Sequence, residues 1–422
     1  MIEFITYFVF LTRSVVDGIF SSIEFQAGGM LLTAGAILNL VVLGLAAALF
    51  FQRRGSIFPI KVWLPYLAIA TLSVTWSSDK GAAVRMLLVL FTYAAMFAIP
   101  FFLRVDYRRN AWLIKASIYS SVIPALYSVL EYFYFLEDDG RIKSTFMHPN
   151  VLAFYLMVIV GIIYFLLSSS TVHIRPFFRK MLVLYSGLLV GLIILTETRS
   201  AWFAVLLILG AFAFFVDRRY LLALVLLPAL LLVPAVSNRI SDLGQGTEYT
   251  GQMRSEDDAV NSFAWRELMW ESAMDDVAGS RILGKGLASF GLNSIVFFPL
   301  ADREPDDYGA HGLGAHSAYV QALYETGILG FVCYIGMYFS LIKRALRQYR
   351  RDPRGTVMMV SIILAYMTVN FSDNIFDYGG LNWYFWGFFG TVFAKFDRDT
   401  IEIAARSRLA RQVDVQPFAS AS

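Results

Sequence analysis

Three side chains that lie far apart in the sequence have the chemistry needed to transfer a group from a phosphate-linked donor. Arg199 lies in the short connection between two apolar segments, Arg266 borders Met269 and Trp270 on a helix face, and His316 opens a long apolar segment. A guanidinium can bind a phosphate through two parallel hydrogen bonds, and an imidazole at a helix start is favoured in its neutral form and can accept a proton. Two arginines for an anionic leaving group and one base for a hydroxyl nucleophile are what transfer from a diphosphate-linked donor requires.

Each of the three also has a structural interpretation, which the sequence leaves open. Arg199 could extend to lipid phosphates at the membrane surface. Arg266 could pair with Glu267 or another nearby acid. His316 could simply cap its helix.

Weaker candidates for the same site lie close to these positions or at another helix start. Pro149 suits the first turn of a helix, so the residues beside it could cap that helix or hydrogen-bond sugar hydroxyls. No carboxylate cluster has metal-ligand spacing, so we expect no metal, no cofactor and a metal-free reaction. These weaker candidates are His148, Asn150, His311, Ser317 and Tyr319, with Ser317 as the expected N-cap of the helix after His316.

The elements that position these residues are expected to be membrane helices. Of the 422 residues, 58% are hydrophobic and 16% are charged, and the mean hydropathy is +0.60, which is too apolar for a soluble protein. Runs of about 20 apolar residues match a hydrocarbon core roughly 30 Å thick. We predict an all-α integral membrane protein with about 12 transmembrane helices, over residues 4–22, 29–51, 57–77, 82–103, 112–135, 149–168, 181–196, 200–216, 220–236, 318–341, 356–372 and 382–395.

The basic residues predict how the chain is oriented. Most of the 35 Lys and Arg residues fall in alternate connections, which by the positive-inside rule are cytoplasmic. Residues 1–236 then hold nine helices, 237–317 form a large loop on the outer side, 318–395 hold three more helices, and 396–422 form a cytoplasmic tail. Both termini are predicted to be cytoplasmic. The net charge of +3 follows from this bias and gives no reason to expect nucleic-acid binding.

The outer loop contains two recognisable segments. NSFAWRELMWESAMDDV, residues 261–277, predicts an amphipathic helix with Phe263, Trp270, Ala273 and Met274 at helical spacing, lying across the mouth of the bundle. RILGKGLASFG, residues 281–291, follows, and its glycines permit tight turns and a close approach of two backbones.

Several of these stretches together resemble a known family. The combination of TETRSAW, NSFAWRELMWE, ILGKGLASFG and AHSAYVQALYETGILG is similar to the O-antigen ligase and polysaccharide polymerase superfamily of bacterial membrane glycosyltransferases. SVTWSSDKGAAVRMLLVLF and STFMHPNVLAFYL resemble segments of its exopolysaccharide polymerase branch. The likeness runs from about residue 70 to 395.

The resemblance implies a GT-C-like helical bundle in the bacterial inner membrane, with the active site on the periplasmic face. It implies a donor glycan on undecaprenyl diphosphate, an acceptor glycan and inverting, metal-independent transfer. Arg199 and Arg266 match the family's diphosphate-binding arginines, and His316 matches the base that activates the acceptor hydroxyl.

The resemblance leaves the acceptor open. We expect a polymerase, which uses a second lipid-linked repeat unit. The alternatives are a ligase, which uses lipid A core, and, from another class, a transporter of lipid-linked glycans.

Overall fold

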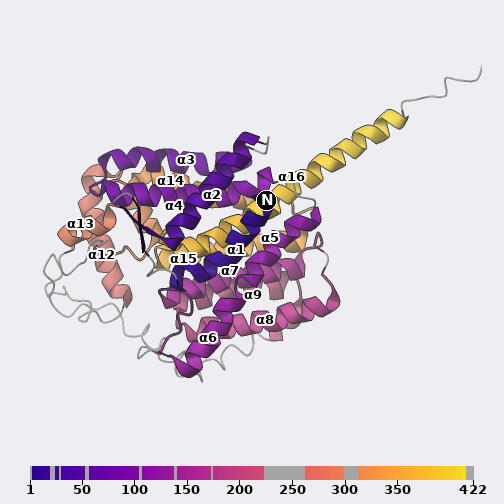
Figure 1. Ribbon diagram of the computed structural model, residues 1–422, viewed down its shortest axis with the longest axis horizontal. Coiled ribbons are helices and arrows are strands. Elements are labelled where there is room, and N and C mark those ends of the chain that lie inside the picture. Colours follow the sequence, from indigo (N-terminus) through magenta and orange to yellow (C-terminus); the bar gives the residue numbers. More distant parts are fainter. Residues whose placement is uncertain are drawn as a thin grey trace, which may run out of the picture.

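The structure is a computed structural model that describes residues 2–19, 24–27, 30–52, 57–103, 107–136, 140–172, 174–222, 262–298 and 312–414. These residues are mostly helical (Figure 1). The helices before the outer loop are α1 (Ile2–Ile19), α2 (Ala34–Gln52), α3 (Phe58–Ser73), α4 (Lys80–Phe102), α5 (Tyr107–Tyr119), α6 (Val122–Tyr134), α7 (Pro149–Ser168), α8 (Pro176–Leu195) and α9 (Arg199–Phe215). The later ones are α12 (Ser262–Asp276), α13 (Phe290–Phe297), α14 (Ala318–Leu346), α15 (Pro353–Ser372) and α16 (Gly379–Asp414). Short 3₁₀ helices are η1 (Val74–Trp76), η2 (Arg218–Tyr220), η6 (Val277–Ser280) and η8 (Ile375–Asp377).

Many of these helices are long and apolar enough to cross a membrane. Within the described residues eight segments meet this criterion, and Phe4–Val16 and Arg199–Phe215 are shorter apolar helices. The protein is therefore a multi-pass membrane protein, as its composition predicts. The number of 12 stays a prediction, because most of the predicted helix 220–236 lies outside the described residues.

The predicted bounds are wrong at three places. A short antiparallel hairpin, β1 (Glu24–Ala27) and β2 (Met30–Thr33), precedes α2, and β2 occupies the start of the predicted helix 29–51; the described fold is otherwise helical, as predicted. The predicted helix 112–135 divides into α5 and α6. Pro124 has no N–H for the carbonyl of Ser120, and the hydroxyl of Ser14 donates to that carbonyl instead, at 2.7 Å. Helix α16 continues to Asp414, past the predicted end at 395.

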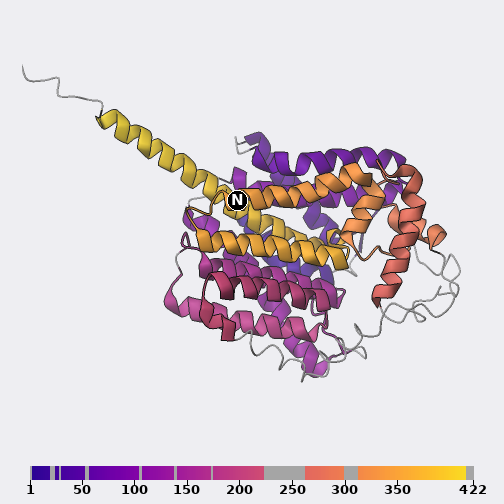
Figure 2. The same ribbon diagram turned by 180° about the vertical axis from the view of Figure 1, so that it is seen from behind.

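Helix α7 is the centre of the bundle. All its residues from 152 to 168 are buried, and it packs against α8, α9, α15 and α16. A helix that is apolar on every side fits only where other helices surround it. Its observed bounds, Pro149–Ser168, match the predicted 149–168. The far part of α16 extends out of the bundle (Figures 1 and 2).

The connections gather at two opposite ends of the bundle. At one end Asp352, which precedes α15, accepts a hydrogen bond from the hydroxyl of Ser169 at 2.5 Å, and Lys395 Nζ donates to the carbonyl of Thr171 at 2.7 Å. We call this the basic end, because Arg175, Arg344 and Lys395 lie there. The opposite end, called the loop end, collects residues 74–79, 140–148, 196–198, 262–298, 312–317 and 373–378. Every described candidate residue lies at or beside the loop end.

Helix α12 runs across the loop end, at a steep angle to the bundle helices (Figures 1 and 2). A helix is confirmed at Ser262–Asp276, but its described buried residues are Ala264, Trp265, Met269 and Ala273, of which the predicted apolar face included only Ala273. Trp270 and Met274 are half-buried at the edge of the same cluster. The prediction missed this face because α12 is covered from two directions: the Trp270 indole also donates to the carbonyl of Ala315 at 2.7 Å and stacks edge-on against Phe371.

The glycine segment docks into a break in α14. Gly327 has φ +66° and ψ −172°, which interrupts that helix and leaves carbonyl groups without helical partners. The N–H groups of Lys285 and Gly286 donate to the carbonyls of Tyr324 and Glu325, both at 2.9 Å. A Cβ on Gly284 would lie 2.5 Å from the Glu325 carbonyl, so the predicted close approach of two backbones is confirmed.

Candidate active site

His316 stands just before α14, at the loop end. Ser317 is the N-cap of that helix, as predicted, and its hydroxyl accepts a hydrogen bond from the N–H of Val320 at 3.4 Å. His316 has φ +47°, a left-handed conformation that costs a non-glycine residue about 1 kcal/mol. Its side chain is 47% exposed, and its Nδ1 lies 4.0 Å from Oδ1 of Asp373. The imidazole is therefore open to a ligand on one side and faces a carboxylate on the other.

Asp373 is a firmly held carboxylate at the loop end. Its side chain is 2% exposed and lies directly after α15. Oδ1 accepts hydrogen bonds from the hydroxyl of Tyr378 at 2.7 Å and from the N–H of Asn374 at 2.8 Å, and Oδ2 accepts one from Nδ2 of Asn150 at 2.7 Å. With these partners Asp373 cannot turn away from His316 without breaking several bonds, so it can orient the imidazole.

Asn150 links Asp373 to the turn between α8 and α9. Its Oδ1 accepts hydrogen bonds from Nη2 of Arg141 at 3.0 Å and from the hydroxyl of Thr198 at 3.1 Å. Arg141 also donates through Nε to the carbonyl of Thr196 at 2.8 Å. A continuous set of hydrogen bonds thus joins the starts of α7 and α9 to the end of α15.

The two candidate arginines border this network from different elements. Arg199 is the first residue of α9, directly after Thr198, and is half-buried. Arg266, on α12, is half-buried and donates from Nη1 to the carbonyl of Ser372 at 2.9 Å. Arg266 and His316 therefore contact consecutive residues, Ser372 and Asp373. Arg199 connects to the same place through Thr198 and Asn150.

The weaker candidates differ in how closely they join this network. His148 is the N-cap of α7: its Nδ1 accepts a hydrogen bond from the N–H of Asn150 at 3.1 Å, and its ring is exposed. Tyr319 is half-buried and donates its hydroxyl to the carbonyl of Met367 at 2.6 Å, which holds it on the side of α15. His311 lies outside the described residues.

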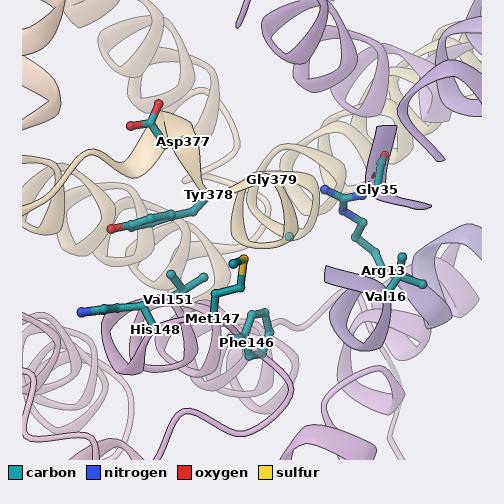
Figure 3. A pocket seen from close by; sticks show the side chains of 11 residues that line it. Arg13, Val16, Gly35, Phe146, Met147, His148, Val151, Asp377, Tyr378 and Gly379 are labelled. Atoms are coloured by element: carbon teal, nitrogen blue, oxygen red, sulfur yellow. Dashed lines mark hydrogen bonds between the residues drawn. The ribbon is translucent and has the colours of Figure 1, made fainter. Parts of the chain in front are cut away.

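A cavity of about 480 Å³ opens beside His148. Figure 3 shows His148 and Tyr378 extending along one part of it and Arg13 lying on the opposite side. Arg13, on α1, is 4% exposed, donates to the carbonyl of Gly35 at 3.2 Å and lies over the ring of Trp383 at 4.6 Å. The cavity thus combines a buried cation with apolar and aromatic walls.

A second cavity, of about 390 Å³, lies on the other side of the segment 373–378. Asp377 borders both cavities, and in Figure 3 its carboxyl group points away from Arg13. The surrounding protein keeps bulk water from this carboxyl and Asp373 adds a like charge, and both raise the pKa of Asp377 to about 7. Asp377 therefore changes its charge near neutral pH.

Asp373, Asp377 and Arg141 were not among the sequence candidates. The available signal was SDNIFDYGG, which places two Asp residues and one Asn directly after an apolar helix. Their importance depends on packing, because Asp373 meets Asn150 across 223 residues of sequence. Within the described part of the chain, no group of three or more His, Cys, Asp or Glu side chains is arranged to hold a metal ion.

Comparison with known proteins finds a similarity to one family. Residues 184–335 match the family model described as O-antigen ligase. The match spans α8 to most of α14 and includes Arg199, Arg266 and His316. The comparison with curated proteins found no match. The family's members are membrane glycosyltransferases. Residues 184–335, just over a third of the chain, are therefore similar to the O-antigen ligase family, in agreement with the resemblance of the motifs.

Proposed function

We propose that the protein is a polymerase of surface polysaccharide, which joins glycan units carried on undecaprenyl diphosphate at the periplasmic face of the inner membrane. The observation that carries this proposal is the pair formed by His316 and Asp373, with Arg266 bound to the preceding residue. A base, an orienting carboxylate and a phosphate-binding cation are thereby gathered at one end of α15. The family match over residues 184–335 supports the same class of reaction.

The proposed reaction uses His316 as the general base. Because Nδ1 faces the carboxylate of Asp373, the proton of the imidazole is favoured there, and Nε2 is left with its lone pair towards the exposed side. Nε2 accepts the proton of the acceptor hydroxyl while that oxygen bonds to the anomeric carbon of the donor sugar. The bond from this carbon to the diphosphate oxygen breaks, and undecaprenyl diphosphate leaves. Attack opposite the leaving group inverts the anomeric configuration.

The arginines act on the leaving group in this scheme. Arg199 and Arg266 stabilise the negative charge that grows on the diphosphate, and a guanidinium does so through two parallel hydrogen bonds. The helix start of α9, where Arg199 is the first residue, adds N–H groups that also favour an anion.

The direct test uses purified protein and lipid-linked repeat units. We expect chains longer than one unit to form with the natural sequence, and His316→Ala to lower the rate at least 100-fold. His173→Ala, in the connection between α7 and α8, is the matched control and is expected to leave the rate unchanged. Full activity of His316→Ala would exclude the assignment of the base. If the purified protein moves lipid-linked units across a vesicle membrane but never lengthens them, it is a transporter.

A ligase is the second candidate, and the description of the matched family favours it. Deleting the gene separates the two reactions. For a polymerase, the cells accumulate single or short lipid-linked units and no long polymer. For a ligase, long polymer persists but is missing from lipid A core.

A further inference from the structure

The cavity of about 390 Å³ at the loop end has the lining of a sugar site. We call it the acidic cavity. Its size lies within the range of roughly 300–1,000 Å³ found for small-molecule sites. Four elements far apart in the sequence build it: the start of α4, the segment 288–292, the start of α14 and the segment 374–377. Its polar lining consists of Asp79, Arg85, Gln321, Glu325, Asn374 and Asp377.

The polar groups of the acidic cavity are held in place. Glu325 is 3% exposed, and its carboxylate accepts hydrogen bonds from Nε2 of Gln321 at 3.2 Å and from the N–H groups of Ala288 and Phe290. Asp79 caps α4 by accepting a hydrogen bond from the N–H of Ala82 at 2.8 Å. Fixed carboxylates and amides at a cavity wall provide acceptors and donors for hydroxyl groups without having to be ordered on binding.

The lining of the acidic cavity argues against the diphosphate of the donor. Three carboxyl groups line it and one guanidinium, Arg85, lines its exposed side. A diphosphate would find only this guanidinium to neutralise it, whereas sugar hydroxyl groups can hydrogen-bond to the acids whether these are ionised or protonated. Arg199 and Arg266 do not belong to its lining. Neutral hydroxyl-bearing rings fit this lining better than a diphosphate does.

The acidic cavity adjoins the proposed base. Ala315, the residue before His316, and Asn374, the residue after Asp373, are both part of its lining. The cavity beside His148 lies across the segment 373–378 and carries the buried cation Arg13. A transfer between two glycans needs two binding positions that meet at the base, and two cavities separated by one short segment provide them.

We propose that the acidic cavity binds the terminal sugar rings of the acceptor glycan and presents one of their hydroxyl groups to His316. This inference rests on the proposed glycosyl transfer and names the site of its second substrate. The acceptor's terminal sugars lie far from its own lipid diphosphate, so they suit a cavity whose lining includes neither Arg199 nor Arg266.

The test compares binding of two probes to the purified full-length protein. One probe is an oligosaccharide released from the surface polysaccharide of the producing strain, followed by saturation-transfer NMR. The other is undecaprenyl diphosphate. The variants are Gln321→Ala and Glu325→Gln, and the matched controls are Gln52→Ala and Glu271→Gln, both on exposed positions. Thermal unfolding of each variant shows whether it has folded.

We expect both cavity variants to weaken oligosaccharide binding at least 10-fold, with undecaprenyl diphosphate affinity within twofold of the natural protein and the controls unchanged. Oligosaccharide binding within twofold in both folded variants would overturn the proposal. Equal loss of both probes would also overturn it, because the cavity would then serve the donor. If the natural protein binds the oligosaccharide in this cavity but transfers nothing, the acceptor cavity stands and the proposed polymerase fails.

Discussion

Replacing Asp373 by Asn tests the arrangement around His316 most directly. Asn has nearly the same shape but exchanges one carboxylate oxygen for an NH₂ group. Three donors now reach this carboxylate, from Asn150, Asn374 and Tyr378. In the variant at least one of them would face another donor. A hydrogen bond to a charged group contributes about 1.5–3 kcal/mol, so we expect a stability loss of roughly 2–4 kcal/mol.

The loss of activity should be larger than the loss of stability explains. A neutral amide favours the proton on Nδ1 of His316 less than the carboxylate does, so Nε2 is less often free to act as a base. The equivalent exchange in serine hydrolases lowers turnover about 10⁴-fold. Because Nδ1 and Oδ1 are 4.0 Å apart here, we expect a fall in kcat of about 10² to 10⁴, which corresponds to roughly 2.7–5.4 kcal/mol.

The assay measures kcat and KM for polymer formation by folded protein, and Asp352→Asn is the matched control. Asp352 precedes α15 at the basic end, is 0% exposed and accepts hydrogen bonds from Ser169, Ser170 and Gly355. We expect it to lower the thermal unfolding temperature by a similar amount and to keep kcat within threefold. An Asp373→Asn protein with kcat within fivefold of the natural value would refute the orienting role of the carboxylate.

Two further predictions concern stability and pH. Gly327→Ala places a Cβ about 2.2 Å from the carbonyl oxygen of Ile282 at φ +66°, so the segment 281–291 cannot dock against α14. We expect the free energy of unfolding, measured by thermal unfolding, to fall by roughly 2–4 kcal/mol. Gly336→Ala, on the open face of α14, is the control and should have a negligible effect. Asp377→Asn tests the raised pKa. Between about pH 4 and 7 the folded chain keeps a proton on the Asp377 carboxyl and the unfolded chain does not. The stability that this bound proton contributes is therefore present at low pH and is lost as the pH rises through about 7. The unfolding temperature of the natural protein should therefore fall more between pH 5 and 8 than that of the variant, and equal falls would contradict the raised pKa.

The helices were predictable where local rules decide. Helix α7 was predicted with its observed bounds, because Pro149 fixes its start and an unbroken apolar run fixes its length. Ser317 was recognisable as an N-cap from its type and position. The glycines of GKG signalled a close backbone approach, although not which backbone they meet. These features depend on neighbours within a few residues in the chain.

Breaks inside apolar runs were less predictable. The interruption of α14 at Gly327 depends on donors supplied by residues more than 40 positions earlier in the sequence. Strand β2, MLLT, replaces the start of the predicted helix 29–51, although its residues are apolar enough to continue one. Apolar composition sets the membrane location of a segment, whereas its partners decide where the helix stops.

From the sequence alone one could infer the multi-pass membrane architecture, the similarity to the O-antigen ligase family over residues 184–335, and the residue types needed to bind a phosphate and accept a proton. Composition and short motifs carry that information, because hydrophobic length and side-chain chemistry are local properties. Only the tertiary structure decided that Asp373 faces His316, that Asn150 joins it to the start of α9, and that two cavities meet at Asp377. Those relations arise where the ends of helices distant in sequence pack at one end of the bundle, and no local pattern records which ends will meet.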